Sequence, residues 1–210
     1  MTHHGTEDIA IMRSLPYMNI IAPGDPKETQ FATEYFAQGH GPGFLRLGRA
    51  GEPIVHNNEI DWQFGKAIKL RNGKDLTIIA TGSMLKKAVE TAEILDSSGI
   101  SVSVLSMHTI KPLDENAILE TALSTQRIIT LEEHCINGGL GGAVAEVLLE
   151  KSDTKIYFKR FGLPSIFTKH VGSQEYLLQP SRLVPNLIAS DVLQWIQNEK
   201  HTDILHTVKN

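Results

Sequence analysis

The feature that most constrains the fold is a regular alternation of strand-like and helix-like segments from residue 74 to about residue 200. Short runs rich in Ile, Leu and Val are each followed by a segment whose apolar residues recur at helical spacing. The predicted strands cover 75–81, 100–107, 127–132 and 155–160, and the predicted helices cover 85–97, 112–123, 139–151 and 181–198. Because crossovers between parallel strands are right-handed and place helices on both faces, this order predicts a three-layer α/β/α domain with a mostly parallel sheet.

The first 50 residues carry fewer elements. A strand is expected at 18–22, and a helix after it begins with Asp25 as N-cap, Pro26 at the first helical position and Glu28 in place to close a capping box. A second strand is expected at 43–48. So small a set buries too little surface to stand alone.

The chain therefore divides into three parts. Residues 1–50 are predicted to be a partial α/β domain whose beginning is absent. Residues 51–73, where Gly, Pro and Asn interrupt any periodicity, are predicted to be a linker. Residues 74–210 are predicted to be a complete domain.

Composition excludes several functional classes. The formal net charge is -4 with no basic stretch, which argues against nucleic acid as a partner. No apolar run reaches the roughly 18–20 residues that span a bilayer, and the first residues resemble no secretory leader. Cys135 is the single cysteine, so an intrachain disulfide is impossible. We expect a cytoplasmic protein without a membrane partner.

A glycine-rich run, GGLGG at 138–142, follows a predicted strand and opens a predicted helix. One interpretation is a phosphate cradle, because N–H groups at a helix start attract anions. However, the spacing is not that of a dinucleotide fingerprint. We prefer a tight turn that allows close packing of helix against sheet.

Two groups of polar residues could suggest other chemistry. His3 and Glu7 stand four apart, but no third metal ligand can be placed, so a metal site is not predicted. His134 beside Cys135 could suggest a nucleophile pair, and 132–133 (Glu-Glu) could suggest acid–base catalysis. We interpret Cys135 as structural and the two glutamates as loop caps.

Arg46 and Arg49 close the second predicted strand, with Gly48 between them. Ligands of parallel α/β sheets bind at the carboxyl ends of strands. The guanidinium fork suits phosphate, because it donates two hydrogen bonds at once. The alternative, a solvated arginine pair at a strand edge, stays open on this reasoning.

Six stretches together resemble the transketolase family, and one of them, SVLSMHTIKPLDE, is similar to part of its C-terminal domain. The run THHGTEDIAIMRSLPYMNIIAPGD is similar to the later part of the pyrimidine-binding domain, and GFLRLGRAGEP to its last strand and loop. The runs KDLTIIATGSMLKKAVETAEIL, RIITLEEHCINGGLGGAVAEVL and FGLPSIFTKHVGSQEYLL are similar to the C-terminal domain. The order is preserved over nearly the whole chain.

The resemblance implies roles for three residues. His3 matches the histidine beside the thiazolium ring of thiamine diphosphate, where a neutral imidazole can accept or relay a proton. Arg49 matches the arginine that binds the phosphate of the sugar substrate, and Arg46 would assist it. The implied reaction transfers a two-carbon ketol unit between sugar phosphates.

The resemblance also implies missing parts. Family members hold Mg²⁺ and the diphosphate with a Gly-Asp-Gly…Asn motif, and no Gly-Asp-Gly occurs here. The glutamate that activates the cofactor would lie upstream of Thr2. We therefore expect no cofactor on this chain alone, and expect it to be inactive without an N-terminal transketolase chain or domain. A homo-oligomer is also expected.

Other assignments remain open. Within the same class, 1-deoxyxylulose-5-phosphate synthase and the β-subunit of 2-oxoacid dehydrogenases share this architecture. In another class, the chain would be a non-catalytic interaction or dimerisation module.

Overall fold

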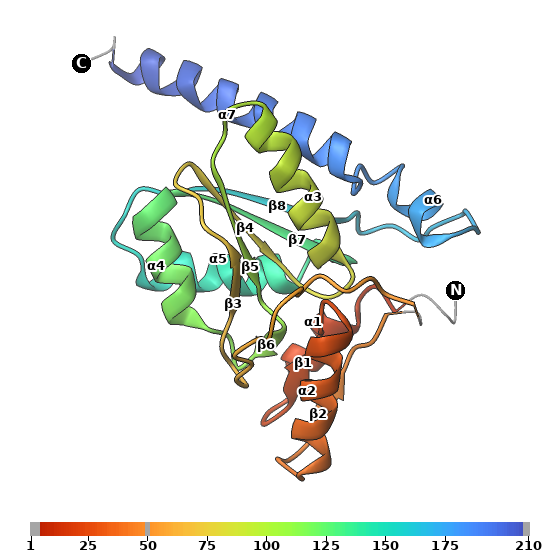
Figure 1. The fold of residues 1–210 in the computed structure, drawn as a ribbon. Coiled ribbons are helices and arrows are strands. Elements are labelled where there is room, and N and C mark those ends of the chain that lie inside the picture. Colours follow the sequence, from red (N-terminus) through yellow and green to blue (C-terminus); the bar gives the residue numbers. More distant parts are fainter. Residues whose placement is uncertain (1–4, 49–50, 208–210) are drawn as a thin grey trace.

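The computed structural model describes residues 5–48 and 51–207, with side chains described as far as residue 198. Its larger sheet has five strands in the order β3-β5-β4-β7-β8 (Figure 1). These are β3 (Ile68–Arg71), β5 (Val102–Ser106), β4 (Leu76–Ala80), β7 (Arg127–Cys135) and β8 (Tyr157–Leu163). All neighbours are parallel except the antiparallel pair β3 and β5.

Helices cover both faces of this sheet. They are α3 (Met84–Ser97) and α7 (Pro185–Thr207) on one face, and α4 (Glu115–Thr125) and α5 (Leu140–Lys151) on the other. The short helix α6 (Gln174–Leu178) precedes α7. The predicted α/β fold with three layers and a mostly parallel sheet is confirmed.

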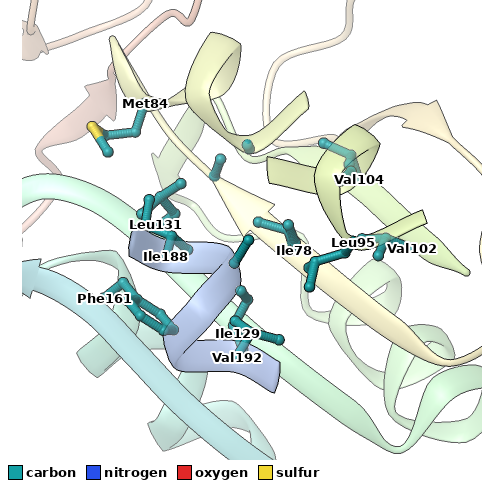
Figure 2. Close-up of a cluster of buried hydrophobic side chains, with 14 of the residues drawn as sticks. Ile78, Met84, Leu95, Val102, Val104, Ile129, Leu131, Phe161, Ile188 and Val192 are labelled. Carbon is teal, nitrogen blue, oxygen red and sulfur yellow. The ribbon is translucent and has the colours of Figure 1, made fainter. Parts of the chain in front are cut away.

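Alternation along β4 explains why both faces bury apolar residues. Ile78 packs in the cluster shared with α3 and α7, whereas the next residue, Ile79, packs in the cluster under α4 and α5. Successive side chains of a strand point to opposite faces, so a strand covered on both sides becomes a continuous apolar run. Figure 2 shows Ile78 with Ile188 and Val192 of α7 in the first cluster.

The smaller sheet combines segments that are far apart in the sequence. Its strands are β1 (Asn19–Ile21), β2 (Gly43–Leu45) and β6 (Thr109–Lys111), and its helices are α1 (Asp8–Arg13) and α2 (Pro26–Ala37). Strand β1 lies between β2, to which it is parallel, and β6, to which it is antiparallel. Two residues separate the end of β5 from the start of β6, so the chain passes directly from the larger sheet into the small one.

The N-terminus of α2 matches the predicted cap with one change. The Asp25 carboxylate accepts the Glu28 N–H at 2.9 Å. Glu28 accepts the N–H of Gly24 at 2.6 Å, one residue before the cap position. The second carboxylate oxygen of Asp25 accepts the N–H groups of Val55 and His56 at 3.1 and 3.0 Å, so this buried cap also anchors the segment predicted as a linker.

Four elements have no counterpart among the predicted ranges. Strand β3 lies within the segment predicted as a linker, 51–73, and α1, β6 and α6 lie in stretches to which no element was assigned. Helix α4 begins after the predicted residue 112, because the Asp114 side chain accepts the N–H of Ala117 and sets its start. No helix in the described part of the chain is both long and apolar enough to cross a membrane.

Candidate functional site

Two of the three predicted site residues, His3 and Arg49, lie outside the described residues. Arg46 is described, and it directly follows β2. Its backbone N–H donates to the Ile21 carbonyl at 2.8 Å, which continues the pairing of β2 with β1. The described residues that are nearest in sequence to His3 and Arg49 are those from Gly5 into α1 and Arg46.

The guanidinium of Arg46 joins three parts of the molecule. Its Nε donates to both Asp8 carboxylate oxygens, at 2.8 and 3.1 Å. One terminal nitrogen donates to the carbonyl of Gly5 at 2.8 Å and to that of Glu133 at 3.0 Å. The Arg46 and Asp8 side chains are 20% and 22% exposed, so this charge-assisted pair is partly shielded from water. Arg46 thus ties the end of β2 to the start of α1 and to β7.

Helix α1 rests on the carboxyl end of β7. The backbone N–H of Cys135 donates to the Thr6 carbonyl at 2.7 Å. Arg13 donates to the Gly138 carbonyl at 2.8 Å and forms an ion pair with Glu146 of α5 at 2.5 Å. A short helix docked by these contacts takes its orientation from the larger sheet.

His134 supplies another contact to α1. Its Nδ1 lies 2.7 Å from the Cys135 carbonyl, to which it can only donate, so Nε2 is the acceptor. Nε2 lies 3.3 Å from the backbone nitrogen of Ala10 and accepts its N–H. Burial lowers the pKa of His134 and so favours this neutral form. Sequence reasoning missed this role, because the two residues are 124 positions apart.

The N–H groups of the glycine-rich turn at 138–142 bond to a carboxyl group of β7. The buried Glu132 carboxylate accepts the N–H groups of Leu140 and Gly141 at 2.6 and 2.8 Å. A Cβ at Gly139 would clash with this carboxylate and lie 2.6 Å from the His134 Nδ1. The preferred interpretation, a tight turn with close helix–sheet packing, is confirmed, and the Leu140 and Gly141 N–H groups are engaged by Glu132.

The neighbouring polar residues show no nucleophile pair. Cys135 is buried, and both ring nitrogens of His134 are taken by backbone groups, so the imidazole does not activate the thiol. The Glu133 carboxylate accepts from the Ser83 hydroxyl at 2.5 Å and from the Gln174 amide. These contacts bring α6 to the loop before α3.

No three His, Cys, Asp or Glu side chains converge on a possible metal position among the described residues. Glu7 and Asp8 are described, and Asp8 is engaged by Arg46.

Comparison with known proteins places this geometry in a family. A family model described as the transketolase C-terminal domain matches residues 65–183. A putative transketolase C-terminal section of Methanocaldococcus jannaschii is 38% identical over 200 residues, which cover 94% of this chain and 62% of that protein. One of the subunits of an apulose-4-phosphate transketolase of Phocaeicola vulgatus is 40% identical over 176 residues, which cover 83% and 55%. The chain thus spans little more than half the length of these relatives.

Two further matches extend the likeness. A 1-deoxy-D-xylulose-5-phosphate synthase of Desulforudis audaxviator is 38% identical over 172 residues, which cover 81% of this chain and 27% of that protein. A solved structure described as a split-gene transketolase in an inactive β4 tetramer superposes with a TM-score of 0.86 at 36% identity, and covers 93% of this chain and 63% of that one. The chain belongs to the transketolase family, and its residues 65–183 are a transketolase C-terminal domain.

Proposed function

We propose that this chain is the C-terminal part of an enzyme that transfers a two-carbon ketol unit between sugar phosphates. The observation that carries the proposal is the contact between Arg46 and Gly5. His3 stands two residues before Gly5, and Arg49 stands three residues after Arg46. This hydrogen bond supports the proposal because it joins two described residues, each of which is within three positions of a predicted site residue in the sequence.

Each residue takes a distinct part. Arg49 binds the phosphate of the sugar by a bidentate, charge-assisted contact. His3 accepts or relays a proton at the reacting end of the substrate. Arg46 assists by holding the end of β2 to the residues before α1. Its Nε donates to Asp8, and one terminal nitrogen donates to the carbonyls of Gly5 and Glu133.

The complete enzyme would use thiamine diphosphate and Mg²⁺, held by an N-terminal transketolase chain or domain. The cofactor would supply the carbanion chemistry of ketol transfer. One relative is named as a transketolase subunit and another as a split-gene transketolase, and both names support a division of this enzyme between chains. A homo-oligomer of this chain, paired with such a partner, is the assembly that we propose.

The test reconstitutes this chain with a candidate N-terminal partner, thiamine diphosphate and Mg²⁺, and measures ketol transfer. We expect turnover with the pair and none with either chain alone. Arg49→Ala should raise KM for phosphorylated substrates by roughly tenfold to a hundredfold, the loss expected for one charged hydrogen-bond pair, and should change KM for unphosphorylated substrates much less. His3→Ala should mainly lower kcat.

Arg182→Ala is the matched control, because Arg182 pairs with Asp191 of α7, far along the chain from these segments. It should leave both kinetic constants unchanged. If Arg49→Ala weakens both substrate types equally, the phosphate role is wrong.

A second candidate is the reaction of 1-deoxyxylulose-5-phosphate synthases, favoured by the 38% identity to one such enzyme. The two reactions are distinguished by supplying either a ketose phosphate donor or a 2-oxoacid donor, because only the reaction with the 2-oxoacid releases CO₂. A pair that binds tightly but turns over neither donor would instead favour the non-catalytic interaction module.

A further inference from the structure

His134 is fully buried at the carboxyl end of β7, where the proposed reaction gives it no task. We propose that His134 is a positioning residue for His3: it caps helix α1 from the larger sheet and so fixes the segment that carries the catalytic imidazole. The inference rests on the proposed function for its catalytic part and on hydrogen bonds of described residues for its structural part.

Helix α1 needs such a cap. It has six residues, and isolated helices shorter than about 12 residues are marginal in water, so its stability comes from its surroundings. Glu7, at the N-cap position, makes no side-chain cap. Among the first N–H groups, that of Ile9 is accepted by Asp8 at 2.9 Å and that of Ala10 by His134 at 3.3 Å. The side chain that usually caps from the preceding residue is here supplied by another domain.

The cap has a fixed orientation. Because Nδ1 of His134 donates to the Cys135 carbonyl, the ring presents Nε2 as an acceptor towards α1. Gly139 leaves the space for this ring and for the Glu132 carboxylate, because a Cβ there would lie 2.6 Å from Nδ1. Gly138, with a φ of 80°, lets the turn approach α1, where its added Cβ would lie 2.7 Å from the Ala10 Cβ. The glycine-rich turn therefore serves the docking of α1.

A second hydrogen bond from β7 holds the backbone close to His3 in the sequence. The Cys135 N–H donates to the Thr6 carbonyl at 2.7 Å, next to the His134 contact with Ala10. One strand end thus holds the backbone on both sides of the α1 start. His3 is three residues before Thr6 in the sequence, and the proposal requires that a shift of this anchor changes the placement of His3.

The first arm of the test measures hydrogen exchange of the amides from 5 to 13 in the full chain. His134→Leu removes the acceptor and should speed exchange there by about tenfold, the effect of losing one capping bond. His134→Gln keeps an amide oxygen near the position of Nε2, and should leave exchange close to that of the unaltered chain.

The control is His56→Leu. His56 is also a buried histidine, and its ring bonds to Glu28 of α2 at 2.7 Å rather than to α1. It should lower thermal stability without changing exchange from 5 to 13. Equal exchange in His134→Leu and the unaltered chain would overturn the cap. So would equal acceleration of residues 5–13 in both Leu variants, because the effect would then be general loosening.

The second arm measures ketol transfer in the reconstituted complex. His134→Leu should lower kcat by roughly tenfold to a hundredfold with KM for phosphorylated substrates little changed, since small misplacements of a catalytic group have effects of this size. His134→Gln should recover most of kcat. Faster exchange in His134→Leu with unchanged kcat would overturn the link to His3. A complex of unaltered chains without turnover would instead defeat the proposed function, and the exchange arm would still decide the cap.

Discussion

The five-stranded sheet and the three-stranded sheet differ in how their faces are covered. Apolar residues that are almost fully buried line both faces of the larger sheet in two extended clusters. The cluster of the small sheet has four buried members, Ile9, Ile20, Ala22 and Ile110. Nearby, Ile11 is 60% exposed and Tyr17 is 89% exposed. The larger sheet is held by apolar packing, whereas the small sheet relies heavily on hydrogen bonds and ion pairs reaching it from outside.

This contrast matches the division of tasks in the proposal. The described residues that adjoin the predicted site positions, Gly5 and Arg46, lie beside the small sheet, and the contacts around them come from Arg46, His134 and the Cys135 backbone. Loops and weakly packed elements commonly carry function on a rigid support. The larger sheet would then be the support that fixes the geometry of a less stable neighbour.

The largest expected effect on the free energy of unfolding comes from replacing one buried isoleucine by alanine in each sheet. Ile78→Ala should lower the free energy of unfolding by about 2–5 kcal/mol, because a dense core relaxes little around a cavity. Ile20→Ala should cost less, because its smaller cluster can collapse into the space. Urea unfolding of both variants measures the comparison. An Ile20→Ala loss equal to that of Ile78→Ala would remove the contrast between the sheets.

The next effect concerns Glu132, where the two regions meet. Burial raises its pKa to about 7. The folded chain then keeps a proton that the unfolded chain releases near pH 4.5, so stability falls as pH rises from about 4.5 to 7 and stays lower above that. A shift of this size corresponds to a loss on the order of 3 kcal/mol. Glu132→Gln should abolish this dependence.

Other groups near Glu132 also contribute to the pH dependence of stability, so the measurement must separate their effects from that of the carboxyl group. The Leu140 and Gly141 N–H groups and the charges of Arg160 and Arg46 lower its pKa, without cancelling the effect of burial. The lowered pKa of His134 acts in the opposite direction, because stability then increases as pH rises towards 6.5. The difference between unaltered chain and Glu132→Gln, measured by urea unfolding from about pH 4.5 to 8, isolates the carboxyl group. A difference independent of pH would contradict the raised pKa.

The smallest effect should come from Asp25, which caps α2 and holds the segment at 55–56. Asp25→Ala should cost about 1–2 kcal/mol, the usual range for a lost cap, and should speed exchange mainly in α2 and at 55–56. Asp25→Asn keeps one acceptor and should cost less. Exchange that also rises across β4 and β7 would show that the two regions unfold together.

The sequence was most informative where burial is complete. The runs around β4, β5 and β7 are apolar because helices cover both faces, and that pattern can be read without knowing any contact. Strand β3 was missed because it is an edge strand with intermediate burial, and its one ladder has a register shift. Strand β6 was missed because three residues carry too little periodicity to recognise.

The site was predictable to a smaller extent. The resemblance points to His3 and Arg49, which lie outside the described residues and stay predictions. The role of Arg46 in phosphate binding also stays a prediction, and its bonds to Asp8 and Gly5 depend on tertiary packing that no local pattern reveals. The same holds for His134, whose partner Ala10 carries no special side chain and contributes only a backbone N–H.

Strand β6 has a consequence for dividing this polypeptide. It pairs with β1 although it comes from the other half of the sequence. Consider cleavage of the backbone in the 57–61 stretch, between the segment anchored by Asp25 and β3. The first fragment would contain β1 without its antiparallel neighbour, and the second fragment would contain that neighbour, β6. The two fragments should therefore reassociate by strand complementation, with Lys111 donating to the Arg13 and Leu15 carbonyls at 2.8 and 2.6 Å as an added lock. A gene split at this position would encode two polypeptides that each need the other to complete the small sheet.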